Sequence, residues 1–193
     1  AANRFFIEES LYDRFITEYI ERAKSLKLGF GVDEAVDMGP MVDEKSRNRM
    51  FELIEDAVDK GATLACGGYI PENLQKGAWI APTVLTDTTT DMRVFKEEIF
   101  GPVAAFMKFK TDDEVLELAN DTEYGLASYL FTNNHKRIQR FTEELQFGEV
   151  QINGVKYAIY LPHGGIKESG IGHDCSHLAI EDYIVKKRIS TAL

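Results

Sequence analysis

The sequence has few cysteines, little positive charge and no long apolar run. Its two cysteines, Cys66 and Cys175, are too few and too far apart for a disulfide framework, which favours free thiols in a reducing cytoplasm. Lysine and arginine number 22 against 32 acidic residues, and the net charge of −10 argues against nucleic acid or an anionic membrane as a partner. No stretch reaches the roughly 18 apolar residues of a membrane span, and none resembles a signal peptide.

The remaining composition is that of an ordinary globular protein, with 44% hydrophobic and 28% charged residues. A length of 193 residues allows one large domain or two very small ones. Strand-like and helix-like segments alternate along the chain, which predicts an α/β fold with a largely parallel sheet flanked by helices. We expect strands at residues 4–7, 62–66, 79–85, 103–109, 126–131, 150–153 and 183–190, and helices that begin near Ser10, Asp43, Thr111, Asn134 and His177.

Local signals refine the first helices and one strand. Ser10 is the expected N-cap of the first helix, and Asp43 that of the second. Pro82 interrupts the expected strand at 79–85, which favours an edge position for that strand. Helical spacing predicts two buried stripes, one of Leu11, Phe15, Tyr19, Ala23 and Leu26, and one of Met50, Leu53, Ile54, Ala57 and Val58.

The segment Lys96–Pro102 carries two carboxylates and an aromatic ring beside a Gly-Pro turn. A carboxylate can accept hydrogen bonds from both hydroxyls of a ribose diol. Glu98 and Phe100 would lie on the same side of an extended segment, so a flat ring could pack beside such a ligand. Spacing alone favours the simpler interpretation of a solvated carboxylate and a core phenylalanine.

Two further segments are rich in glycine, Asn120–Ala127 and Pro162–Asp174. The glycine spacing in the second fits neither a P-loop nor the dinucleotide fingerprint, so it predicts a sharply turning backbone. His173, Cys175 and His177 form an alternating cluster, but a helix that aligned the two histidines would direct the cysteine elsewhere. Since zinc needs about four converging ligands, we expect no metal site.

Taken together, the three segments resemble the aldehyde dehydrogenase superfamily, and the resemblance extends from the first residues to about Ser190. It covers only the C-terminal part of such an enzyme. The resemblance implies that residues 1–182 form an incomplete catalytic domain. It also implies that residues 183–193 are the terminal strand and tail of a bridging sheet between subunits, in a homodimer or homotetramer.

The resemblance also implies roles for individual residues. The Glu-Glu-x-Phe-Gly-Pro motif matches without a departure, so Glu98 is expected to bind the nicotinamide ribose of NAD or NADP and Phe100 to lie beside the nicotinamide. His163 would lie near the aldehyde pocket. His163 stands where many members have Phe, and Asp174 where most have Glu, which is similar to aminoaldehyde-type members. Succinic semialdehyde, which we favour weakly, an aminoaldehyde and a small hydroxyaldehyde all remain open.

The family nucleophile is a cysteine just before an Ala-Asn-Arg sequence that matches Ala2-Asn3-Arg4. The resemblance therefore implies that the nucleophile precedes Ala1, together with the general base and the dinucleotide-binding domain. Neither Cys66 nor Cys175 has a local signature of an activated thiolate. We expect the parent enzyme to oxidise an aldehyde to an acid and the isolated chain to be inactive. The alternatives are a truncated homologue that serves as an assembly module and a metal-binding domain built on the histidine cluster.

Overall fold

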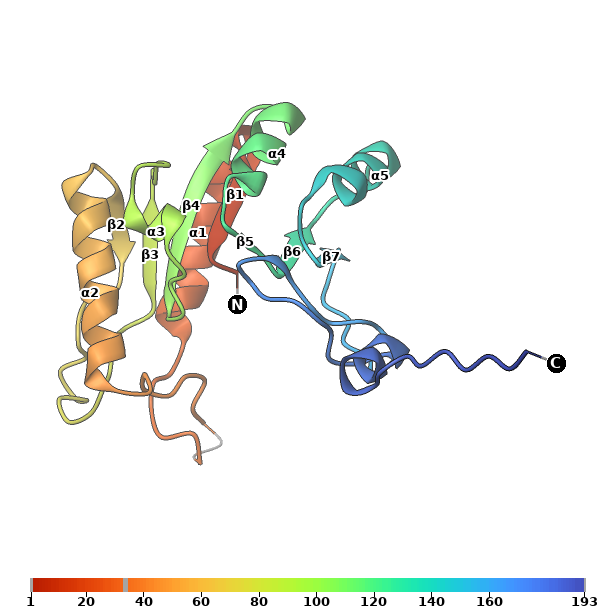
Figure 1. The fold of residues 1–193 in the computed structure, drawn as a ribbon. Helices are drawn as coiled ribbons and strands as arrows, with labels where there is room; N and C mark the ends of the chain where they lie inside the picture. The colour runs from red at the N-terminus through yellow and green to blue at the C-terminus, as the bar shows by residue number, and fades with distance from the viewer. Residues whose placement is uncertain (1, 33–34, 193) are drawn as a thin grey trace. The chain divides into compact units, whose positions relative to one another are not determined.

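A computed structural model describes residues 2–32 and 35–192, so Ala1 lies outside the described residues. The chain divides into two compact units, Ala1–Thr111 and Asp112–Leu193 (Figure 1). The expected α/β fold with a mostly parallel sheet is confirmed. The first unit contains β1 (Arg4–Glu8), α1 (Glu9–Ser25), α2 (Glu44–Asp59), β2 (Thr63–Cys66), β3 (Thr83–Thr86), α3 (Arg93–Lys96) and β4 (Val103–Phe109).

The first unit is built on a four-stranded sheet in the order β1-β4-β3-β2. Strand β4 pairs in parallel with both β1 and β3, and only β2 runs antiparallel to its neighbour. Because side chains alternate across a strand, each face has its own core. Helix α1 packs over Val84, Ala104 and Phe106, and α2 packs over Leu85 and its neighbours on the opposite face (Figure 1).

The buried stripe of α1 differs from the expected one. Ala23 is buried and Tyr19 packs against the core as expected, but at the start of the helix Tyr12 and Ile16 are buried in place of Leu11 and Phe15, which are 57% and 41% exposed. Two adjacent rows of this helix are apolar, and packing against the sheet selects the later row over its first turns. Ser10 is not the N-cap either, because the helix begins directly after β1 and Ser10 Oγ donates to Glu8 Oε1 within its first turn.

Helix α2 follows the prediction more closely. Asp43 caps it by accepting a hydrogen bond from the Ser46 amide at 2.7 Å, as its position before the helix predicts. Met50, Leu53, Ile54 and Ala57 are buried as expected, but Val58 is exposed, because it lies at the border of the stripe.

Pro82 does not place its strand at an edge. Strand β3 begins one residue later, at Thr83, and lies between β4 and β2. Because Pro82 precedes the strand, its missing amide proton costs no hydrogen bond between the strands. The Thr83 amide donates to the Pro102 carbonyl at 2.8 Å and starts the pairing of β3 with β4.

The second unit has smaller sheets. Strand β6 (Ala127–Leu130) pairs in parallel with β7 (Glu149–Ile152), and β5 (Tyr124–Gly125) pairs antiparallel with β8 (Ile166–Lys167). Its helices are α4 (Asp112–Asn120), α5 (His135–Glu144) and the 3-10 helix η1 (His177–Tyr183). Helix α5 begins near Asn134, as predicted, and Asn134 caps it by accepting from the amides of Lys136 and Arg137.

Residues 184–192 have no regular secondary structure, so the strand expected at 183–190 does not form in the single chain. A strand that joins the sheet of another subunit needs that subunit as its partner. The assignment of residues 1–182 and 183–193 to a catalytic domain and a bridging segment therefore stays a prediction. Within residues 2–32 and 35–192, none of the helices has the length and apolar content needed to cross a bilayer.

Candidate functional site

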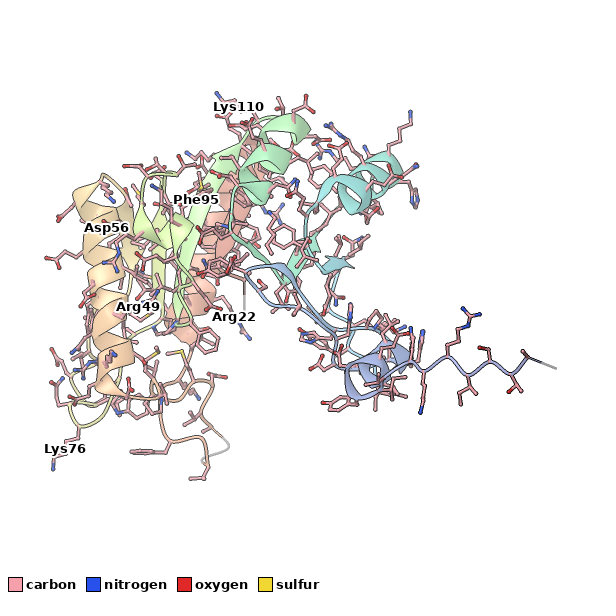
Figure 2. The ribbon with its side chains drawn as sticks, viewed as in Figure 1. Arg22, Arg49, Asp56, Lys76, Phe95 and Lys110 are labelled. Carbon is pink, nitrogen blue, oxygen red and sulfur yellow. The ribbon has the colours of Figure 1, made fainter. Side chains whose placement is uncertain are left out.

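The segment between α3 and β4 is held by charged and polar contacts from several elements. Arg93 binds the Glu97 carboxylate, with Nε 2.6 Å from Oε1. Arg49, which comes from α2 and is labelled in Figure 2, binds the same carboxylate and donates to the Ile99 carbonyl at 3.2 Å. The Ile99 side chain is 2% exposed and belongs to the core under α2. Both neighbours of Glu98 are therefore fixed.

Glu98 and Phe100 are the side chains that this arrangement leaves in solvent. Phe100 is 83% exposed, and its φ of +49° is unusual for a bulky residue. Glu98 is exposed, and no hydrogen bond or ion pair to its carboxylate is found within residues 2–32 and 35–192. The sequence expectation of a core phenylalanine is thus wrong, and an exposed carboxylate and an exposed ring do share one short segment. The left-handed φ of Phe100 also means that the segment is not extended throughout, as the same-side argument assumed.

Gly101 allows this segment to approach α2. A Cβ at that position would collide with Met50 Sδ and crowd Met41. Because Met50 is buried, either its side chain or the segment would have to shift to admit a side chain here, so the glycine has a steric role next to the candidate residues.

Asn3 was not expected from the sequence to take part in this site. Its Nδ2 donates to the Glu97 carbonyl at 2.9 Å, and its Oδ1 accepts from the Ile99 amide at 2.7 Å. The two bonds lie on either side of Glu98. The sequence gives no local signal for this contact, since the bonded residues are 94 and 96 positions apart.

The charges of the two adjacent glutamates have different surroundings. A hydrogen bond from Arg93 lowers the pKa of Glu97, and the charges of Arg93 and Arg49 lower it further against partial burial. Glu97 is thus a structural carboxylate, neutralised within the protein. In the described part of the chain, no cation is bound to the Glu98 carboxylate in the same way, so its acceptor capacity is open to a ligand.

In the second unit, the two glycine-rich segments pack against each other. Tyr124 and Gly125 pair with Lys167 and Ile166 across β5 and β8, and the Gly125 amide donates to Ser169 Oγ at 2.9 Å. Lys167 Nζ donates to the carbonyls of Asn120 and Thr122, each at 3.1 Å. A cation at the C-terminus of α4 is stabilised by the helix dipole, so this lysine has an architectural role.

His163 and Asp174, the two departures from the family pattern, are bonded to each other. His163 Nδ1 lies 2.6 Å from Asp174 Oδ1, and the two backbones exchange hydrogen bonds of 3.0 and 2.9 Å. Glu149 Oε1 lies 3.6 Å from His163 Nε2 and is itself buried. The imidazole therefore lies between two carboxylates. The sequence showed that His163 and Asp174 both depart from the family pattern, but it did not predict that their side chains are in contact.

The cysteines and remaining histidines show no comparable arrangement. Burial raises the pKa of the Cys66 thiol, which disfavours the nucleophilic thiolate. In the part of the chain that the structure describes, no group of three or more His, Cys, Asp or Glu side chains is arranged to hold a metal ion. A surface hollow of about 410 Å³ in the first unit is lined by Phe30, residues 72–76 and Trp79. It includes neither Glu98 nor Phe100.

Comparison with known proteins explains these segments. The sequence model of the aldehyde dehydrogenase family matches residues 1–189. The chain belongs to the aldehyde dehydrogenase family. The resemblance seen in the three motifs is thereby confirmed over nearly the whole chain.

Individual relatives within the aldehyde dehydrogenase family differ in their named substrates. The chain is 42% identical to a 3-sulfolactaldehyde dehydrogenase of Pseudomonas putida, over 97% of this chain and 38% of that protein. It is 40% identical to the NADP(+) succinate-semialdehyde dehydrogenase of Escherichia coli, over 100% of this chain and 40% of that protein.

Solved aldehyde dehydrogenase structures share the fold. A betaine aldehyde dehydrogenase of Staphylococcus aureus in complex with NAD+ superposes with a TM-score of 0.91 at 38% identity, covering 95% of this chain and 37% of that one. A succinate-semialdehyde dehydrogenase of Burkholderia pseudomallei gives the same TM-score at 40% identity, with 95% and 38% covered. The chain thus spans about 38% of the length of such relatives.

Proposed function

We propose that the chain is part of an NAD(P)-dependent aldehyde dehydrogenase that converts an aldehyde and water to a carboxylic acid. The overall reaction consumes one aldehyde, one NAD(P)+ and one water and gives the acid, NAD(P)H and a proton. By the family mechanism, a cysteine thiolate adds to the aldehyde to give a thiohemiacetal, loss of a hydride to NAD(P)+ converts it to a thioester, and a base-activated water hydrolyses that thioester. The observation that supports this chain's part is the anchored segment that leaves Glu98 and Phe100 exposed.

The residues present fit the nicotinamide half of the cofactor. Among residues 2–32 and 35–192, no hydrogen bond or ion pair occupies the two carboxylate oxygens of Glu98, which suits the two hydroxyls of a ribose. Phe100 presents a ring that can pack beside a flat heterocycle, and its backbone is fixed by the contacts of Ile99 and Gly101. When bound, the nicotinamide accepts a hydride. The chain's own contribution is to bind and orient that group, which places it for the reaction.

For the substrate, we propose that His163 lies near the aldehyde pocket. The carboxylates of Asp174 and Glu149 on either side of its imidazole support a polar or cationic substrate such as an aminoaldehyde. Succinic semialdehyde and a small hydroxyaldehyde are the other candidates, as relatives named for several aldehydes show similar identity. We further propose a homodimer or homotetramer in the cytoplasm.

The proposal implies that the 193-residue chain does not turn over an aldehyde by itself. The nucleophile, the general base and the dinucleotide-binding domain would lie in a preceding part of the protein, and neither Cys66 nor Cys175 replaces the nucleophile. We expect no formation of NADH or NADPH by the chain with a panel of aldehydes. We expect turnover once the chain is extended by its upstream coding sequence.

The test compares the chain, the longer protein and a Cys66→Ser/Cys175→Ser variant of each. Reduced cofactor is followed by absorbance, and the acid product is identified by mass spectrometry. Turnover by the chain that survives both substitutions would contradict the assignment of the nucleophile. A longer protein that binds NAD(P)+ but oxidises no aldehyde would contradict the proposed reaction.

A further inference from the structure

The carboxamide of Asn3 is bonded on both sides of Glu98. Nδ2 donates to the carbonyl of the preceding residue at 2.9 Å, and Oδ1 accepts from the amide of the following residue at 2.7 Å. Among side chains of this length, only asparagine offers both a donor and an acceptor in that geometry. Aspartate lacks the donor, and glutamine is one methylene longer.

Asn3 is itself held in place. The next residue, Arg4, begins β1 and pairs with Ala105 of β4. The Arg4 guanidinium also lies 5.0 Å from the ring centre of Phe95 (labelled in Figure 2), which is buried on α3. The start of β1 therefore contacts both α3 and the segment that follows it, and Asn3 is a rigid support rather than a mobile surface residue.

The other contacts of this segment do not duplicate those of Asn3. Arg93 and Arg49 bind the Glu97 side chain, and Arg49 also binds the Ile99 carbonyl. Asn3 instead binds the backbone carbonyl of Glu97 and the amide of Ile99. Because Ile99 is buried, loss of Asn3 would leave its amide without a partner or force the segment to move.

We propose that Asn3 is the positioning residue of Glu98. It fixes the backbone on both sides of that residue, and it acts on the cofactor only through the Glu98 carboxylate. This inference rests on the proposed function, in which Glu98 binds the nicotinamide ribose. It connects the start of β1 directly to the orientation of the nicotinamide.

The first test uses the 193-residue chain and needs no cofactor. Backbone NMR order parameters of Glu98 and Phe100 should be near the rigid value of about 0.85 and fall to about 0.6 or less in Asn3→Ala. Exchange of the Ile99 amide should become at least about tenfold faster. Asn48→Ala is the matched control, because Asn48 is exposed on α2 and accepts only from Arg47 among the bonds described. It should change neither quantity.

A second variant separates the two bonds if Asn3→Ala does not fold. Asn3→Asp retains an acceptor for the Ile99 amide and loses the donor to the Glu97 carbonyl. Protection of Ile99 should therefore remain while the order parameter of Glu98 falls. Unchanged order parameters in either variant would overturn the proposal.

The second test is a double-mutant cycle in the longer enzyme, with single-turnover hydride transfer as the readout. Asn3→Ala should slow hydride transfer at least about tenfold with little change in the KM for the aldehyde. It should cause no further slowing in a Glu98→Gln background. Additive effects would overturn the proposal for Asn3. A Glu98→Gln variant with normal hydride transfer would instead contradict the role of Glu98, and the order parameters would still report whether Asn3 positions the segment.

Discussion

The two units of the chain differ in how completely they bury their apolar side chains. The first contains both core clusters, which cover the two faces of its sheet. In the second, the buried hydrophobic side chains among residues 112–192 are Val115, Leu116 and Phe141. Its exposed large hydrophobic residues include Tyr157, Ile159, Tyr160, Ile171, Tyr183, Ile184, Val185 and Ile189. The first unit buries apolar side chains on both faces of its sheet. The second leaves many large apolar side chains exposed, which is typical of a surface that binds another protein segment.

The same difference applies to the candidate residues. Glu98 and Phe100 lie on a segment fixed by Asn3, Arg49 and a buried isoleucine, before any ligand is present. His163 lies in the second unit, and its Nδ1 is in hydrogen-bond contact with an Asp174 side chain that is 74% exposed. Preorganisation is therefore built into the cofactor-binding candidates and is weaker around the substrate-pocket candidate.

The largest expected contrast is in amide hydrogen exchange of the 193-residue chain. Amides of β4 should exchange only by global opening, with a free energy of roughly 5 kcal/mol or more. Amides of β6 and β7 should exchange with a far smaller opening free energy, because few buried contacts hold them. Equal protection in the two units, measured by mass spectrometry of peptides, would show that the second unit is stable without a partner.

A pair of core substitutions sharpens the comparison. Phe106 is fully buried and its ring lies 4.8 Å from those of Phe5 and Tyr19. Phe106→Ala should lower the free energy of unfolding of the first unit by about 3–5 kcal/mol. Phe141→Ala, in the second unit, should leave the main denaturant transition almost unchanged. If both variants shift the main transition equally, the two units unfold as one.

Removing the charge of Glu98 should slow hydride transfer, whereas removing the charge of the adjacent Glu97 should affect it much less. In the longer enzyme, Glu98→Gln weakens two charge-assisted hydrogen bonds to the ribose, each worth about 1.5–3 kcal/mol. Hydride transfer should slow and show a larger isotope effect with deuterated aldehyde, while thermal stability stays unchanged. Glu97→Gln should affect hydride transfer much less. If the two substitutions slow hydride transfer equally, or if Glu97→Gln slows it more, the assignment of the ribose contact to Glu98 is wrong.

Glu97 should instead make the first unit sensitive to acid. Its pKa is lowered by the Arg93 hydrogen bond, so its stabilising contribution is complete above the unfolded value of about 4.3 and is lost as the pH falls through the folded pKa. The side chain is 36% exposed, so solvent screening limits the effect to about 1 kcal/mol or less. Thermal unfolding of the chain and of Glu97→Gln from about pH 6 to pH 3 should show a smaller pH dependence in the variant.

The smallest effect is expected at His163. His163→Phe removes the hydrogen bond to Asp174, and an exposed contact of this kind contributes only about 0.2–1 kcal/mol even when both groups are charged. The loss should stay within that range at low and at high salt. His135→Phe, at the exposed start of α5, is the control. A loss above about 2 kcal/mol at either salt concentration would show that the imidazole and Glu149 form a buried network rather than a surface pair.

Local signals in the sequence predicted the elements that depend on neighbouring residues. The apolar run of β4, the Asp43 cap of α2 and the start of α5 near Asn134 all lie where the sequence placed them. The aldehyde dehydrogenase motifs identified the family, and they drew attention to Glu98 and Phe100. Whether these two residues bind the cofactor stays a prediction, since only their exposure and support are visible.

The features that the sequence missed depend on distant contacts. Two rows of α1 are equally apolar, and only the sheet selects Tyr12 and Ile16. Pro82 indicated an edge strand only because the strand was expected to include it, whereas β3 begins at Thr83. The strand expected at residues 183–190 does not form in the single chain, and its pairing with a second chain stays a prediction. Nothing in the sequence singled out Asn3, because the backbone groups that it binds belong to residues 97 and 99, near the other end of the first unit.

The pairing of Asn3 with residues 97 and 99 also sets an order of events during synthesis. The asparagine leaves the ribosome 94 to 96 residues before the groups it binds, and β1 likewise precedes β4, its only strand partner in the described sheet. At translation rates of about 5–20 residues per second, the wait is roughly 5–20 s. During that interval a nascent β1 lacks the strand with which it pairs in the described sheet. A pause in translation just before β4 would therefore lengthen the time for which this apolar strand waits for that partner.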